Sequence, residues 1–134
     1  MTDSLLRFHF RDSPVRGETC RLSESYQEVL DRHAYPTPVA ALLGQAMAAV
    51  ALMASTLKFD GNLILQIQGD GPVGLLMAEC NDRGELRAIA RYDEARPLAG
   101  LPWTGLTGAG RLVLTIDPEH GERYQGIVPL EGET

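Results

Sequence analysis

The chain has 134 residues, of which 44% are hydrophobic and 22% charged, a composition typical of one folded globular domain and not of a disordered chain. The formal net charge is −6, from 12 basic and 18 acidic residues, and the basic residues form no cluster. An acidic domain of this kind is poorly suited to phosphate backbones, so the charge argues against a nucleic-acid-binding protein.

The cysteines, Cys20 and Cys80, are far apart and form no Cys-X-X-Cys pair, so we predict neither a secreted disulfide framework nor a zinc site. The opening residues, MTDSLLRFHF, lack the basic region and long apolar run of a signal peptide. A cytoplasmic location is therefore the default expectation.

The first part of the chain is predicted to be extended and then helical. Leu5 to Phe10 is a short apolar segment with the length of a strand or an arm, and Val15 to Leu22 has the length of a second strand. Ser23 or Ser25 is then expected to cap a shorter helix, and Ser25 with Glu28 has the spacing of a capping box. The two prolines of residues 33–38 end this helix.

Val39 to Leu57 is the longest apolar run, and it contains no charged residue. Its length approaches that of a membrane span, but seven of its residues are alanine and no aromatic belt flanks it. A helix that is apolar on nearly every side is usually buried in protein, so we predict a core helix and no membrane contact. Ala40, Gly44 and Ala48 recur every four residues, which predicts that another element approaches this helix closely.

After this helix the hydrophobic period changes from 3.6 to 2, which is typical of strands. Predicted strands cover residues 62–68, 73–80, 85–92, 111–117 and 123–128. Prolines and glycines break residues 93–110 into an irregular segment, in which Trp103 is expected to pack inside. Helices followed by strands with tight turns indicate an α+β fold: a mostly antiparallel or mixed β-sheet packed against a long buried helix and a shorter N-terminal helix.

The turn from Gly69 to Gly74 has the composition of a phosphate-binding loop, but a strand follows it and no lysine is near. A tight turn is the better interpretation. The sequence also contains neither His-Glu-X-X-His nor Gly-X-Ser-X-Gly, so we predict no catalytic residue, cofactor site or metal ligand, and no enzyme. The alternative is a small acidic enzyme or ligand-binding domain that uses this turn with Glu79 and Asp82, which a pocket of converging polar groups would favour.

Four strings carry a resemblance to a known family. They are Val15-Arg16-Gly17-Glu18, residues 56–61 (TLKFDG), residues 68–72 (QGDGP) and residues 121–126 (GERYQG). Together they resemble the thirty-three-kilodalton heat shock protein family, redox-regulated holdase chaperones of the bacterial cytosol, and the resemblance runs from Val15 to Thr134.

The resemblance implies an ATP-independent, redox-regulated stress-response chaperone whose partners are unfolded or partly folded clients and a second copy of itself, as a homodimer or domain-swapped dimer. It also implies zinc in a C-terminal Cys-X-Cys…Cys-X-X-Cys switch, which has no counterpart here. Residues 1–134 are thus expected to be a single N-terminal client-binding or dimerisation domain, incomplete at its C-terminus. Leu130 to Thr134 look like the lead-in to a further helix, whose absence would leave sheet or helix surface bare.

The expected client surface is apolar, because unfolded clients expose apolar side chains and the burial of apolar area drives binding. The candidates are one stripe of the long helix, with Leu43, Met47, Val50 and Leu57, and the face of the sheet. The same side chains are expected to form the core of the resting fold. A module that only dimerises is the third hypothesis.

Overall fold

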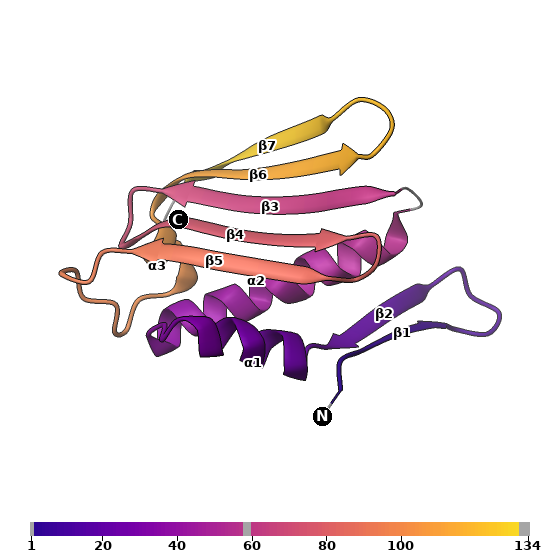
Figure 1. The fold of residues 1–134 in the computed structure, drawn as a ribbon, viewed down its shortest axis with the longest axis horizontal. Helices are drawn as coiled ribbons and strands as arrows, with labels where there is room; N and C mark the ends of the chain where they lie inside the picture. Colours follow the sequence, from indigo (N-terminus) through magenta and orange to yellow (C-terminus); the bar gives the residue numbers. More distant parts are fainter. Residues whose placement is uncertain (1, 58–59, 132–134) are drawn as a thin grey trace.

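The computed structural model describes residues 2–57 and 60–131 (Figure 1). These residues form seven strands and three helices. The elements are β1 (Ser4–His9), β2 (Arg16–Arg21), α1 (Ser23–Arg32), α2 (Thr37–Thr56), β3 (Gly61–Gly69), β4 (Val73–Asn81), β5 (Leu86–Tyr92), α3 (Trp103–Thr107), β6 (Ala109–Pro118) and β7 (Tyr124–Glu131).

The strands form two separate antiparallel sheets. β1 and β2 pair with each other as a hairpin, and the other five strands form one sheet in the order β5-β4-β3-β6-β7. Every pair of neighbouring strands in the five-stranded sheet is antiparallel. The predicted α+β class with an antiparallel sheet is therefore confirmed.

The core lies between α2 and one face of the large sheet. α2 crosses β3, β4 and β5, while β6 and β7 extend beyond it (Figure 1). The period-2 pattern of β3 places Leu63, Leu65 and Ile67 on the α2 side, where each is at most 8% exposed. From the helix, the buried side chains are Val39, Leu42, Leu43, Ala46, Met47, Val50 and Ala51.

α2 is long and apolar enough to cross a membrane by length and composition alone, and 39% of its most apolar window is buried within the protein. Core helices of soluble proteins pass the same test. Here the buried side of the helix supplies one wall of the core, as the sequence predicted.

The predicted close approach to the small residues of α2 is present. The ring of Tyr26, from α1, lies over Gly44, where an added Cβ would come within 3.0 Å of the ring. The Tyr26 hydroxyl donates a hydrogen bond to the Ala40 carbonyl over 2.7 Å. A larger residue at Gly44 would separate the two helices, so this glycine sets how closely α1 packs on α2.

The predicted cap at Ser23 or Ser25 is wrong, because the start of α1 is capped from another part of the chain. The helix begins at Ser23, and its N-cap residue, Leu22, makes no side-chain capping bond. Instead the Asp3 carboxylate accepts hydrogen bonds from the backbone N–H of Glu24 (2.7 Å) and of Ser25, and from the Ser25 hydroxyl. A cap that comes from twenty residues upstream leaves no local spacing to recognise.

Replacing Asp3 by alanine is expected to lower the free energy of unfolding by about 1 kcal/mol at neutral pH, the usual cost of a lost helix cap. Burial raises the pKa of Asp3, but the hydrogen bonds from Ser25 and Glu24 outweigh it and lower the pKa overall. A lowered folded-state pKa means that this stabilisation is complete above the unfolded value of 3.8 and is lost as the pH falls through the folded value.

Thermal unfolding of the wild type and of Asp3→Ala, at neutral pH and in steps below pH 4, measures this effect. The difference in melting temperature between the two proteins should be largest at neutral pH and should disappear in acid. The exposed loop variant Glu94→Ala is the control and should show no such difference. A difference in melting temperature between the wild type and Asp3→Ala that stays constant through the acid range would contradict the role of Asp3 as the cap.

The irregular segment differs from expectation in one respect. It contains the short helix α3, and Trp103, expected to pack inside, is 50% exposed. The reason is that α3 points Leu106 and Thr107 inwards, which leaves its first residue on the surface. Of the expected lead-in to a further helix, Leu130 and Glu131 end β7, and residues 132–134 lie outside the described residues.

Candidate functional site

The glycine-rich turn between β3 and β4 is filled by the protein's own backbone. The N–H groups of Asp70 and Gly71 donate to the carbonyls of Ala109 (3.0 Å) and Thr107 (2.9 Å), and the Asp70 carboxylate accepts from the Ala109 N–H over 2.9 Å. A side chain at Gly69 would overlap the Thr107 carbonyl oxygen. The glycines are therefore needed for contact with the α3–β6 junction, and these N–H groups are not available to a phosphate.

The acids of the alternative enzyme hypothesis are not brought to this turn. Asp82 lies at the other end of the sheet, where its backbone N–H donates to the Gly61 carbonyl over 3.0 Å. Strands of nine residues separate the two ends, roughly 27 Å at 3.4 Å per residue. Glu79 forms an ion pair with Arg87 at 3.2 Å on the face of the sheet opposite α2. No acid–base pair is assembled from these residues.

The predicted client-binding residues are mostly interior. Leu43, Met47 and Val50 are each 0% exposed, and Leu57, at the C-terminal end of α2, is half-buried. Leu43 and Val50 belong to the hydrophobic cluster that α2 forms with the sheet. They could reach a client only if α2 moved away from the sheet, so their role in client binding stays a prediction.

The exposed apolar surface lies elsewhere, and its largest group is on the β1–β2 hairpin, residues 4–21, which we call the arm. The arm projects from the end of the molecule, beside the start of α1 (Figure 1). Its exposed large apolar residues are Leu5, Leu6, Phe8, Phe10 and Val15. Monomeric soluble proteins rarely gather such side chains on one projecting hairpin unless it binds something.

The two faces of the arm have different chemistry, as the strand period requires. Leu6, Phe8 and Phe10 lie on its outer face, and Leu6 is 62% exposed. The Phe8 ring lies across Gly17, its cross-strand partner, and meets the Phe10 ring edge-to-face at 6.1 Å between centroids. The outer face is therefore an ordered aromatic and aliphatic surface open to solvent.

The inner face of the arm is tied to the end of α2 by polar contacts. Glu18 pairs with Arg7 at 3.1 Å and accepts a hydrogen bond from the Ser55 hydroxyl at 2.7 Å. The Arg7 guanidinium also donates to the Ser55 carbonyl. These contacts hold the arm in place while its outer face stays open.

A second exposed apolar region lies on β7, an edge strand of the sheet. Tyr124, Ile127 and Val128 are between 55% and 60% exposed. Tyr124 and Val128 point to the side on which α2 packs, but β7 lies beyond the reach of that helix (Figure 1). Apolar surface is therefore exposed at this edge of the sheet.

The chain's own residues do not fit a zinc switch. Among residues 2–57 and 60–131, no group of three or more His, Cys, Asp or Glu side chains could hold a metal ion. Cys20 and Cys80 are free thiols.

Comparison with known proteins gives the family. The model of the Hsp33 protein family matches residues 3–134, nearly the entire chain. The chain belongs to the Hsp33 family. Among curated Hsp33 relatives, the 33 kDa chaperonin of Pseudomonas syringae pv. syringae is 58% identical over 130 residues, which are 97% of this chain and 43% of that protein. The 33 kDa chaperonin of Ectopseudomonas mendocina is 54% identical over 132 residues, which are 98% of this chain and 45% of that protein.

A solved Hsp33 structure supports the fold. The 33 kDa chaperonin of Thermotoga maritima superimposes with a TM-score of 0.82 at 24% identity, over 96% of this chain and 46% of that one. The chain therefore spans less than half the length of these Hsp33 relatives. Their names are those of a chaperone and not of an enzyme, in agreement with the absence of catalytic motifs in the sequence.

The arm was missed as a site because the sequence offers only a weak signal for it. Leu5 to Phe10 has the apolar content of a buried strand, and nothing in the segment itself shows that no second layer covers it. The signal that could have indicated this site is the separation of the hairpin from the other strands. The chain turns back through Asp12, at a positive φ of 63°, forms β2 and then enters α1, so among the described residues the hairpin pairs with no further strand.

Proposed function

We propose that this chain is a chaperone domain that binds unfolding proteins through the outer face of the arm and prevents their aggregation without ATP. The observation that carries the proposal is the arm itself, an ordered projection whose outer face presents Leu6, Phe8 and Phe10, between 43% and 62% exposed. Family membership supports the same reading, because the relatives are named chaperonins. An unfolded segment would cover these side chains, at about 25 cal/mol for each Å² of apolar area removed from water.

The finer assignment is a redox-regulated holdase of the cytoplasm, with the regulation carried by a zinc switch outside this chain. Burial raises the pKa of both thiols, with a further contribution from the charge of Glu79 at Cys80 and from those of Asp3 and Glu18 at Cys20. A protonated thiol reacts slowly with peroxide. The chain by itself should therefore protect clients equally well in reducing and oxidising buffer.

The experiment is light scattering of a heat-denatured enzyme in the presence of this chain or of its Leu6→Ser/Phe8→Ser variant. Both changes are on the exposed outer face, so stability should change by less than about 1 kcal/mol. Losing two apolar contacts of about 1 kcal/mol or more each should weaken client binding at least about tenfold. Protection should therefore require about ten times more of the variant than of the wild type.

The matched control is Leu101→Ser/Trp103→Ser, which removes two exposed apolar side chains from the segment before β6. It should protect as the wild type does. If the control and the arm variant lose protection equally, the arm is not the binding surface. If the wild-type chain gives no protection at all in either buffer, the chaperone assignment fails for this chain.

A second copy of the chain is the other proposed partner, as a homodimer or a domain-swapped dimer. The exposed edge of β7, with Tyr124, Ile127 and Val128, supports it, because unpaired edges and bare apolar faces favour association. Sedimentation at micromolar concentration should give twice the 14.6 kDa mass of the chain. A monomeric mass would count against the dimer, and a dimer without client protection would leave dimerisation as the function.

A further inference from the structure

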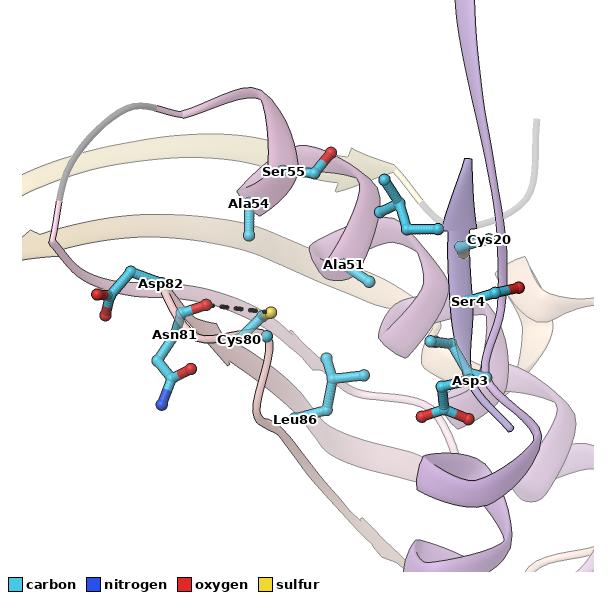
Figure 2. A pocket seen from close by; sticks show the side chains of 13 residues that line it. Asp3, Ser4, Cys20, Ala51, Ala54, Ser55, Cys80, Asn81, Asp82 and Leu86 are labelled. Carbon is cyan, nitrogen blue, oxygen red and sulfur yellow. Dashed lines mark hydrogen bonds between the residues drawn. The ribbon is translucent and has the colours of Figure 1, made fainter. Parts of the chain in front are cut away.

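A pocket of about 330 Å³ lies where the arm meets the body of the protein (Figure 2). We call it the arm pocket. Its walls come from three elements that are far apart in sequence. The base of the arm contributes Cys20, and Asp3 directly precedes the arm. The last turns of α2 contribute Ala51 and Ala54, and the β4–β5 hairpin contributes Cys80 among others. Any molecule bound here would contact the arm and the body together.

The interior of the arm pocket is apolar and polarisable. Methyl groups and two thiols line it, and the thiols use only weak bonds: Cys20 Sγ lies 4.0 Å from the Ala48 carbonyl oxygen and Cys80 Sγ 3.5 Å from that of Asn81. Since burial raises the pKa of both cysteines, they are uncharged at neutral pH. Neutral thiols behave as small polarisable hydrophobes, which suits an alkyl or aryl body.

The rim of the pocket is negative. Asp3 and Asp82 lie at opposite sides of it, with Cys80 between them (Figure 2). Among the described residues that line the pocket there is no lysine, arginine or histidine. Each carboxylate is held in place, Asp3 by the start of α1 and Asp82 by the Gly61 N–H at 3.3 Å. The field at the mouth therefore favours a positive group and disfavours a negative one.

Size limits the ligand further. An apolar cavity of about 150 Å³ accommodates benzene, so a pocket about twice as large has room for roughly a dozen non-hydrogen atoms. We propose that the arm pocket binds a small organic monocation, with its alkyl or aryl body between Cys20, Ala54 and Cys80 and its ammonium group beside Asp3 or Asp82. This proposal is independent of the client-binding assignment.

The test compares two probes of similar length and opposite charge, n-octylammonium and octanoate, below their micelle concentrations. Titrations followed by amide chemical shifts of the full chain should show one site for octylammonium, with shifts at Ala51–Ser55 and Cys80–Gly84. Octylammonium should bind at least about tenfold more tightly than octanoate. Equal affinities, no saturable binding, or shifts confined to other residues would overturn the proposal.

Two variants separate the charge of the rim from the apolar interior. Asp3→Asn/Asp82→Asn keeps one acceptor oxygen at each position but removes the charges, so the tenfold preference for octylammonium should disappear. Its control, Asp31→Asn/Glu94→Gln, removes the same charge from exposed positions that do not line the pocket and should keep the preference. A preference that survives in the first variant would contradict the role of the rim.

Filling the interior is the second arm of the test. Ala54 is half-buried and faces the pocket, so Ala54→Leu should lower octylammonium affinity at least about tenfold. Ala41→Leu makes the same change at an exposed position of the same helix and should have no effect. If Ala54→Leu binds as the wild type does, the site is elsewhere. If this variant does not fold, the charge variants alone decide the question.

Discussion

Replacing Leu43 by alanine is expected to lower the free energy of unfolding by about 3 kcal/mol, with little direct effect on client binding. Leu43 is 0% exposed and packs in the cluster formed by α2 and the large sheet. Removal of a leucine side chain from such a site costs both its transfer free energy and the cavity that remains, 2–5 kcal/mol in comparable cores. For a chain of this size, a loss of about 3 kcal/mol corresponds to a fall in Tm of roughly 10 °C.

Urea unfolding followed by circular dichroism measures this change, and Leu6→Ala is the matched control. Leu6 is 62% exposed on the outer face of the arm, so the same substitution should cost less than about 0.5 kcal/mol there. Client protection, measured well below the melting temperatures, should show the reverse order. If Leu43→Ala leaves stability unchanged and weakens protection instead, the helix stripe is the client surface and the arm is not.

Replacing Gly69 by alanine should destabilise the protein by about 3 kcal/mol, at the upper end of the cost of overpacking. The methyl group would overlap the Thr107 carbonyl oxygen, a backbone atom held by the α3–β6 junction. Relief would require the β3–β4 turn to move away from that junction. Such a movement would break the bonds from Asp70 and Gly71 to Ala109 and Thr107.

Gly74→Ala is the control for this prediction, because it makes the same change five residues further along. The nearest atom to an added Cβ at Gly74 is 3.9 Å away, an ordinary contact, so the cost should be below about 1 kcal/mol. Differential scanning calorimetry of both variants gives the comparison. A Gly69→Ala protein as stable as Gly74→Ala would show that the turn does not pack against the junction as described.

Much of the fold could be predicted from the sequence, because its signals are local. The change of hydrophobic period after Leu57 separates α2 from the strands, and the line of Ala40, Gly44 and Ala48 marks where Tyr26 and the arm approach the helix. Features that depend on contacts between distant segments could not be predicted. The cap of α1 comes from Asp3, and the glycines of the β3–β4 turn are explained by the Thr107 backbone.

The candidate site was harder to predict for the same reason. Composition shows which side chains are apolar, but exposure is decided by which elements happen to cover them. Leu43 and Phe8 are both strongly apolar, yet α2 has a sheet beneath it while the outer face of the arm has nothing over it in the described part of the chain. Sequence reasoning therefore chose the longest apolar stretch, which is the one that the fold buries most completely.

Amide hydrogen exchange of the chain with and without a permanently unfolded client protein tests the central claim most directly. If clients bind to the outer face of the arm, protection should increase in residues 4–21, while the amides of α2, already protected by packing, should exchange at unchanged rates. Unchanged exchange in the arm together with faster exchange along Thr37–Thr56 would mean that clients displace the helix from the sheet, and it would contradict the account.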